Sequence, residues 1–361
     1  MSDYLTHAGG NPGRSGHRLS IAAGRVIYNT REAVAELLGV TDPLRIVFTN
    51  NATEAINLVL HGLLQPGDRV VTTGVEHNAV MRPLVALRRR GVDVVVAPGT
   101  PEGVVQPQEL AAAITPGTRL VVAAHASNVS GAVLQLSEVV AAAHKVGAEL
   151  LVDAAQTVGS VPLAVDAMGI DYLAFSGHKG LLGPPGTGGL AVGPHVNAAT
   201  LSPLVYGGTG SRSESLEQPL FLPDRFESGT PNGVGLAGLG AGVRYVMERG
   251  VEAILAHEQE LRGILCSGLA GISGVTIYGP PSNVATGVLS FTVKGKRVSE
   301  IAQRLDEDHG VLCRVGLHCA PAAHSTIGTF PEGTIRFAAG PYVTADEVEQ
   351  AVVAVQKVVA R

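Results

Sequence analysis

The sequence has few cysteines, little net charge and no long hydrophobic run, and each shortage argues against a class of protein. Three cysteines in 361 residues are too few, and odd in number, for the disulfide framework of a secreted domain. A formal net charge of −5 gives no reason to expect nucleic acid or an anionic membrane as a partner. No run of about 18 apolar residues is present to span a bilayer. The first residues lack the basic and apolar regions of a signal peptide, so we expect a cytoplasmic protein.

Common nucleotide and metal motifs are also missing. No G-x-x-x-x-G-K-[ST] phosphate loop occurs, and the G-x-G-x-x-G string at 233–238 follows no apolar strand. We interpret that string as close helix packing. Cys313 and Cys319 are separated by five residues, a spacing that matches no common zinc pattern, so we predict no metal site.

Short apolar runs alternate with amphipathic segments over the first half of the chain. The predicted strands cover residues 45–49, 69–73, 92–96, 120–124, 150–152 and 172–175. The predicted helices between them cover residues 54–64, 81–90, 107–114 and 136–145. This alternation predicts an α/β fold with a mostly parallel sheet covered on both faces.

The pattern changes near residue 250, and the length of the chain allows two domains. We predict an N-terminal segment at 1–20, a large domain at 21–250 and a small α+β domain at 251–361. The small domain is expected to contain a helix at 251–269, strands at 275–278 and 288–293, and a helix at 299–308. Two further strands and a terminal helix from residue 344 complete it.

Lys179 and Asp153 follow two successive predicted strands, where ligands of parallel sheets collect. Pyridoxal phosphate (PLP) needs a lysine that bonds to it and a carboxylate that keeps its pyridine nitrogen protonated. A lone lysine after a strand is more often a solvated surface charge. His77, at the same edge, has the shape to stack on a flat ring and shuttle protons, or it is structural.

A phosphate site is predicted where a strand leads into a helix at residues 49–54, because helix N-termini bind anions. Thr53 adds a hydroxyl, and Ser176 and His178 approach from another strand. The alternative makes Thr53 an N-cap that stabilises the helix by about 1 kcal/mol.

Seven strings in a fixed order carry a resemblance to a known family. They cover residues 52–57, 76–78, 127–131, 152–156, 176–179, 226–232 and 314–320. With them, roughly residues 10 to 355 resemble the class V aminotransferase superfamily, and within it the second group of cysteine desulfurases with their selenocysteine lyase relatives. The resemblance implies a type I PLP-dependent transferase fold with a seven-stranded, mostly parallel sheet. It also implies a homodimer with its active site at the subunit interface.

The resemblance also implies roles for individual residues. Lys179 would carry the cofactor, Asp153 would pair with its pyridine nitrogen, and His77 would stack on its ring. Its other cofactor contacts would be Asn128 and Gln156 at the phenolic oxygen, Thr53, Ser176 and His178 at the phosphate, and Thr230 at the phosphate of the other subunit. Ala52 is a further predicted cofactor contact. Arg336 would hold the substrate carboxylate.

Cys319 decides between two activities of such enzymes. A desulfurase converts L-cysteine, or selenocysteine, to L-alanine and leaves the sulfur as a persulfide on its own cysteine, from which a sulfur-acceptor protein takes it. Arg314 and His318 are close enough in sequence to supply positive charge to the thiol, and Arg314 is also a candidate substrate ligand. We expect the loop at 316–328 to be mobile and solvent-facing. Cys266 and Cys313 are expected to be inert.

Two other readings stay open: an aminotransferase or lyase in which Cys319 is a bystander, and a non-catalytic, truncated PLP-binding or sulfur-carrier scaffold with an incomplete pocket. Two departures from the family bear on them. The family's opening strand is missing before residues 10–17, so we expect the N-terminal segment to be truncated. Leu317 replaces the histidine that commonly precedes His-Cys in the family's loop.

Overall fold

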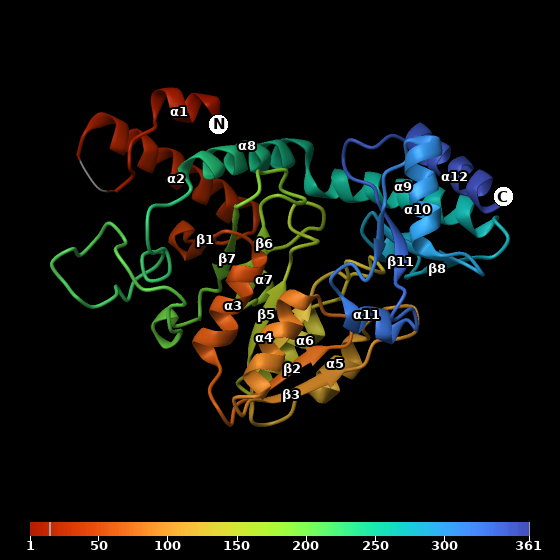
Figure 1. Ribbon diagram of the computed structural model, residues 1–361. Helices are drawn as coiled ribbons and strands as arrows, with labels where there is room; N and C mark the ends of the chain where they lie inside the picture. The colour runs from red at the N-terminus through yellow and green to blue at the C-terminus, as the bar shows by residue number, and fades with distance from the viewer. Residues whose placement is uncertain (14–15, 361) are drawn as a thin grey trace.

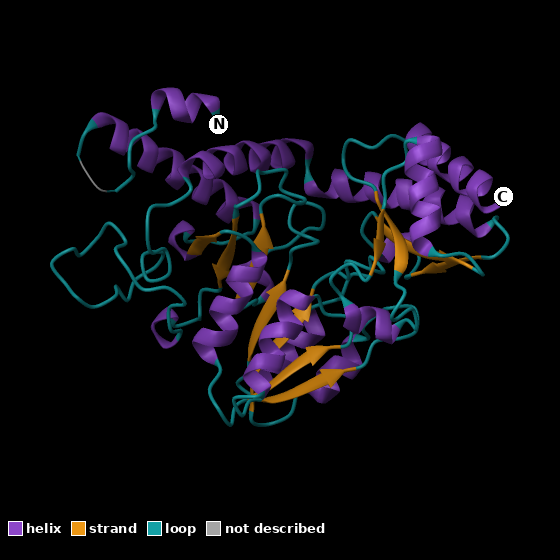
Figure 2. Ribbon diagram, in the orientation of Figure 1, coloured by secondary structure: helices purple, strands orange, loops and turns teal. Residues whose placement is uncertain are grey.

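The computed structural model describes residues 1–13 and 16–360, and two β-sheets organise it (Figures 1 and 2). The segment at 10–17 that resembles the family's beginning includes positions 14 and 15, which lie outside the described residues. The chain starts instead with helices α1 (Ser2–His7) and α2 (Arg18–Leu37). In the described residues, no helix combines the length and the apolar character that a bilayer crossing demands.

The larger sheet has seven strands in the order β1-β7-β6-β5-β4-β2-β3. Its strands are β1 (Ile46–Thr49), β2 (Arg69–Thr73), β3 (Asp93–Ala97), β4 (Thr118–Ala124), β5 (Glu149–Asp153), β6 (Tyr172–Ser176) and β7 (Gly188–Val192). Strands β2 to β6 pair in parallel, whereas β7 is antiparallel to β6 and β1. The predicted mostly parallel sheet is therefore confirmed.

Both faces of this sheet are buried, because successive residues of its strands belong to opposite cores. Leu120 and Val122 pack with the core formed by α3 (Ala52–Leu63) and α4 (Asn78–Arg88). Val121 and Ala123 face the other core. That core is covered by α2, α5 (Pro107–Ala113), α6 (Ser137–Lys145) and α8 (Gly233–Arg249), and the short α7 (Val165–Met168) also contributes to it. Burial on both faces explains why the strands read as continuous apolar runs.

The second sheet belongs to residues 251–361 and is antiparallel, in the order β10-β11-β9-β8. Its strands are β8 (Val275–Tyr278), β9 (Val288–Val293), β10 (Arg314–Gly316) and β11 (Thr334–Ala338). Helices α9 (Val251–Ala270), α10 (Val298–His309) and α12 (Ala345–Ala360) pack with it around a separate core. These elements match the α+β pattern predicted after residue 250.

The segment after β10 returns to the larger sheet's core, which corrects the prediction that residues 316–328 form a solvent-facing loop. Residues Pro321–Thr326 form helix α11, whose Ala323 is buried in that core with Ile327. The hydroxyl of Thr326 donates a hydrogen bond to the carbonyl of Gly74 at 2.7 Å. Figure 1 shows α11 beside the elements of the larger sheet, below β11. This docking brings the preceding turn, with Cys319, to the edge where β2 and β4 end.

Candidate active site

A pocket opens at the carboxyl ends of β2, β4, β5 and β6, where the sequence predicted a ligand. It is lined by Ala52, Thr53, Val75, His77, Ala79, Ala124, Ala126, Asn128, Asp153, Ala155, Gln156, Ser176 and Lys179. The structure thus brings together all the residues predicted to contact the cofactor except His178 and Thr230.

Lys179 and Asp153 face this pocket from neighbouring strands. Asp153 ends β5, and its Oδ1 accepts a hydrogen bond from the N–H of Ala155 at 3.0 Å. Lys179 lies in the turn after β6. Burial lowers the pKa of its amine, Asp153 opposes that shift, and the charges of Arg336 and Arg314 add to it. A lowered pKa increases the share of neutral amine, which is the nucleophilic form of lysine.

His77 is the N-cap of α4, and this contact sets its tautomer. Its Nδ1 accepts a hydrogen bond from the N–H of Ala79 at 3.0 Å, so the proton of the neutral ring is assigned to Nε2. Burial lowers the pKa of His77; the charge of Asp153 works against this shift, whereas that of Lys179 adds to it. The pocket therefore contains a neutral imidazole, which can stack on a ring and donate or accept a proton.

Glu76 is a buried carboxyl group that the sequence reasoning did not single out. Its Oε1 accepts hydrogen bonds from the hydroxyl of Thr73 at 2.6 Å and from the N–H of Ala124 at 2.9 Å. Burial raises the pKa of Glu76 to about 8, and the nearby charge of Asp153 also raises it. Glu76 is thus a neutral side chain whose hydrogen bonds connect the ends of β2 and β4. Its place beside His77, directly after a strand, was the available signal.

The N-terminus of α3 forms the end of the pocket predicted to hold a phosphate. The N–H of Ala52 donates to the hydroxyl of Ser176 at 3.1 Å. The N-cap is Asn51, whose side chain accepts from the N–H of Glu54 at 3.0 Å, so the alternative role of Thr53 as N-cap is wrong. Thr53 is exposed and lines the pocket. His178 is also exposed and is not a lining residue.

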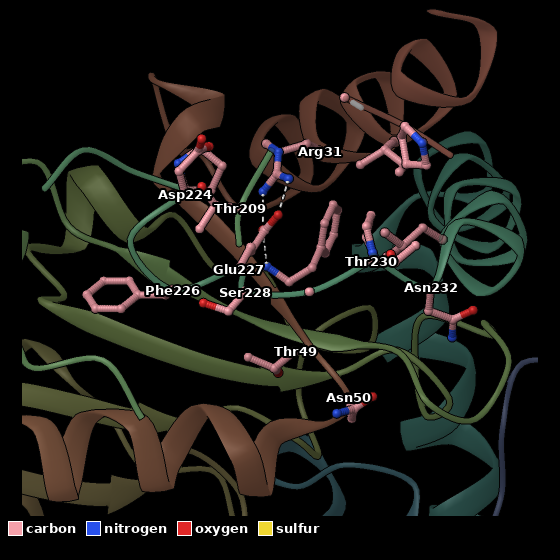
Figure 3. A pocket seen from close by; sticks show the side chains of 18 of the residues that line it. Arg31, Thr49, Asn50, Thr209, Asp224, Phe226, Glu227, Ser228, Thr230 and Asn232 are labelled. Carbon is pink, nitrogen blue, oxygen red and sulfur yellow. Dashed lines mark hydrogen bonds and ion pairs between the residues drawn. The ribbon is translucent and has the colours of Figure 1, made fainter. Parts of the chain in front are cut away.

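Thr230 lines a different cavity, of about 470 Å³, between α2, β1 and the segment before α8 (Figure 3). Arg31 and Glu227 meet there in a two-pronged ion pair with N–O distances of 2.7 and 2.8 Å. Glu227 also accepts from the N–H of Phe48 at 2.7 Å. Within this subunit, Thr230 is therefore separate from the pocket that contains Lys179.

Cys319 lies on a tight turn between β10 and α11, with its thiol exposed. The Nη2 of Arg314 is 3.2 Å from its sulfur. The carbonyl of Cys319 accepts from the N–H of Asn78, at the start of α4, at 2.8 Å. The predicted loop thiol thus lies beside a guanidinium, on a turn bonded to the residue after His77.

His318 points the other way and contributes no charge to the thiol. Its side chain is buried, and its Nε2 is 3.0 Å from the hydroxyl of Thr334. Burial and then the charge of Arg336 lower the pKa of His318 to about 3, so the ring is neutral near pH 7. The positive charge that the sequence suggested for this histidine is therefore absent.

Arg336 and Asn128 connect the pocket to this turn. The Nη1 of Arg336 donates to the carbonyl of Asn128 at 3.0 Å, and the Nδ2 of Asn128 donates to the carbonyl of His318 at 2.7 Å. Among the described residues, the buried Nε of Arg336 has no hydrogen-bond partner. Arg336 is not among the residues that line the pocket, and its unpaired donor is of the kind that binds an anion such as a substrate carboxylate.

The other cysteines have different surroundings. Cys313 is half-buried, and burial together with the charge of Asp306 raises its pKa to about 11. Cys266 lies on α9 with its sulfur 3.2 Å from Nη1 of Arg262, outside the pocket. In the described part of the chain, no group of three or more His, Cys, Asp or Glu residues is arranged to hold a metal ion.

The residues of the pocket fit PLP. An amine with a lowered pKa suits its aldehyde, a carboxylate suits its protonated pyridine nitrogen, and a neutral imidazole suits its ring. Thr53 and Ser176, at the N-terminus of a twelve-residue helix, suit its phosphate. Each part of the cofactor therefore has a matching side chain.

Comparisons with known proteins agree with this site. The model of the family described as "Aminotransferase class-V" matches residues 1–351. A probable cysteine desulfurase of Methanothermobacter thermautotrophicus is 38% identical, over 97% of this chain and 88% of the relative. A cysteine desulfurase of Dickeya dadantii is 35% identical, over 99% and 87%.

Among solved structures, the apo cysteine desulfurase of Thermococcus onnurineus NA1 superposes with a TM-score of 0.94 at 34% identity. This comparison covers 100% of this chain and 90% of that one. The likeness confirms the predicted fold. Class V aminotransferases depend on PLP, the cofactor that the pocket fits. The chain belongs to the class-V aminotransferase family.

Proposed function

We propose that this protein is a PLP-dependent cysteine desulfurase that converts L-cysteine to L-alanine and takes the sulfur onto Cys319. One observation carries the proposal. The exposed thiol of Cys319 lies 3.2 Å from the guanidinium of Arg314, on a turn that is hydrogen-bonded to the rim of the cofactor pocket. The relatives named as cysteine desulfurases support it. The balanced reaction is cysteine plus enzyme thiol giving alanine plus enzyme persulfide.

The pocket residues would handle the cofactor and the protons. When bound, PLP supplies an electron sink that stabilises negative charge on the substrate carbon next to it. Lys179 would hold the cofactor and then, as a neutral amine, accept and return a proton at its Nζ. Asp153 would keep the pyridine nitrogen protonated. His77 would cover the ring and donate from Nε2.

Cys319 would attack the sulfur of the substrate as a thiolate. A guanidinium within hydrogen-bond distance stabilises a thiolate relative to a thiol, and Arg314 is the cation placed to do so. The electron pair of the broken carbon–sulfur bond stays with the substrate, which is protonated to alanine.

Arg336 would hold the carboxylate of the substrate. Its Nη1 is already engaged with the carbonyl of Asn128, which fixes the direction of the guanidinium, and its buried Nε is left for the ligand. The planar guanidinium of arginine binds a carboxylate through two parallel hydrogen bonds, which the ammonium group of a lysine does not provide. Selenocysteine, which differs from cysteine in one atom, fits the same contacts and is included in the proposal as a second substrate.

The proposal extends to the assembly. Thr230 is exposed in a cavity of its own, consistent with a residue that completes the site of a second subunit. The irregular segment before α8 exposes apolar side chains, among them Tyr206 at 68% and Leu220 at 67%. A homodimer interface would cover them. The exposed Cys319 is accessible to a sulfur-acceptor protein, and three free cysteines suit the reducing cytoplasm.

An aminotransferase or lyase with Cys319 as a bystander is the alternative, and a non-catalytic scaffold is a third reading. Alanine release from L-cysteine, measured with the PLP-loaded protein, distinguishes them. We expect alanine from the wild type and from Cys313→Ser, the matched control, and little from Cys319→Ser. Equal alanine release by Cys319→Ser and Cys313→Ser would support the alternative, and no release by any of them would support the scaffold.

A further inference from the structure

The turn that carries Cys319 has an uncommon backbone. His318 and Cys319 both have positive φ angles, of 50° and 60°. This region is unfavourable for residues other than glycine. Two such residues in succession persist only where surrounding contacts hold them. The contacts that hold this turn therefore determine where the thiol points.

Hydrogen bonds to main-chain carbonyls hold the turn from two sides. Asn128 Nδ2 donates to the carbonyl of His318, and the N–H of Asn78 donates to the carbonyl of Cys319. The N–H of Ala320 donates to the carbonyl of Leu317 at 2.7 Å and closes the turn. These bonds fix the peptide planes and leave the side chains of His318 and Cys319 to be fixed separately.

The side-chain anchor is the imidazole of His318, buried to 2% exposure. It contacts Thr334, which is fully buried on β11, with 3.0 Å between Nε2 and the hydroxyl. The ring also lies 5.4 Å, centroid to centroid, from that of His324. His318 is thus anchored inward, whereas the next residue, Cys319, is exposed with its sulfur 3.2 Å from Nη2 of Arg314.

Thr334 is also connected to Arg336 by a chain of three hydrogen bonds whose two ends lie on β11. Thr334 and Arg336 are two residues apart on β11, so their side chains share a face of the strand. From Arg336 this chain of hydrogen bonds runs to the carbonyl of Asn128, from the amide of Asn128 to the carbonyl of His318, and from the ring of His318 to Thr334. The candidate substrate arginine therefore lies on β11, and the turn that carries the thiol is held by a residue of the same strand.

We propose that Thr334 is a positioning residue: through His318 it fixes the turn that presents the Cys319 thiol to Arg314. The inference rests on the proposed function only for its effect on turnover. The geometry of the thiol is a property of the PLP-loaded protein and is measurable without any catalysis.

The test is the rate at which iodoacetamide alkylates Cys319, read from its peptide by mass spectrometry in the full-length PLP-loaded protein. Thr334→Val removes the hydroxyl at nearly constant volume, whereas Thr334→Ser retains it. Thr292→Val removes a hydroxyl from β9 of the same sheet and is the matched control. We expect Thr334→Val to slow alkylation about threefold or more, since loss of a neighbouring cation lowers thiolate reactivity. Thr334→Ser and Thr292→Val should react like the wild type.

The direction of the change separates positioning from general loosening. Cys319 is already exposed, so a turn that merely becomes more mobile would react at the same rate or faster. An unchanged or faster rate in Thr334→Val, or an equally slow rate in Thr334→Ser, would overturn the proposal. In an Arg314→Gln background, Thr334→Val should cause no further slowing, and an additional loss there would also contradict it.

His318→Phe is the second approach if Thr334→Val does not fold. It keeps an aromatic ring but removes the nitrogen that contacts Thr334, so the same slowing is expected and a wild-type rate overturns the proposal. Turnover is measured in parallel. If wild-type protein forms no alanine, the proposed function fails, whereas the alkylation rates still decide the role of Thr334.

Discussion

The side-chain amide of Asn128 donates a hydrogen bond of 2.7 Å to the carbonyl of His318, and this bond joins the cofactor pocket to the turn that carries Cys319. Asn128 lines the pocket, while His318 directly precedes the thiol. The carbonyl of Asn128 also accepts from Arg336. Asn128 therefore joins the cofactor pocket to Arg336, the candidate substrate ligand, and to the turn before Cys319, the proposed nucleophile.

Lys179→Ala is expected to abolish the visible absorbance of the bound cofactor and all turnover. The other pocket residues remain, so the fold should be intact, and circular dichroism with thermal unfolding checks this. Lys145→Ala, an exposed position on α6, is the control and should retain wild-type absorbance. Normal absorbance and activity in Lys179→Ala would remove the basis of the site assignment.

Arg336→Lys is expected to raise KM for cysteine about tenfold or more, because hydrogen bonds to charged groups contribute about 1.5–3 kcal/mol each and the ammonium lacks the planar fork. PLP affinity should change little. Arg297→Lys, at a side chain that is 79% exposed, is the control. An unchanged KM in Arg336→Lys would exclude the proposed carboxylate contact.

Glu76→Gln tests the buried neutral carboxyl. The pKa of Glu76 rises from its ordinary value of 4.5 to about 8 on folding, so the native state binds the proton more tightly than the unfolded state between these values. The contribution of Glu76 to stability is therefore fully present below about pH 4.5 and is lost as pH rises through 8. Glutamine does not titrate, so the Tm of Glu76→Gln relative to wild type should increase from pH 5 to pH 8. A difference in Tm that does not vary with pH would show that Glu76 is ionised throughout.

Selenocysteine provides a test of what the thiol does. A carbon–selenium bond is weaker than a carbon–sulfur bond and needs less assistance from an attacking thiolate. Cys319→Ser should therefore lose much less alanine formation with selenocysteine than with cysteine, while Arg336→Ala should impair both substrates alike. Equal losses of Cys319→Ser with both substrates would contradict an attack on the sulfur by Cys319.

Much of the fold was predictable because both faces of the central strands β4 to β6 are buried and these strands are mostly apolar. Strand β7 was missed, since its Gly188 and Gly189 disfavour a strand. The structure requires them: a Cβ on Gly188 would lie 2.6 Å from the Cα of Asn51, and one on Gly189 would lie 2.7 Å from the carbonyl of Val47. Such close approaches depend on the packing of distant segments and are invisible in the local pattern.

The candidate site was predictable where it follows strand ends and less so where it depends on tertiary contacts. Lys179, Asp153 and His77 follow strands that are evident in the sequence, and the structure brings them together. The direction of His318 depends on Thr334, and the docking of α11 depends on the core of the larger sheet. Neither contact has a local signal, so the charge assigned to His318 and the solvent-facing position assigned to its loop were wrong.

The most direct test of the account is the location of the sulfur after a single turnover. PLP-loaded protein is mixed with a limiting amount of L-cysteine without reductant. The masses of the peptides that contain its cysteines are then measured by mass spectrometry, and the alanine formed is quantified. We predict one added sulfur atom on Cys319, in an amount equal to the alanine formed, and none on Cys266 or Cys313. Alanine without added sulfur on Cys319, or sulfur on another cysteine, would contradict the assignment of Cys319 as the sulfur-accepting nucleophile.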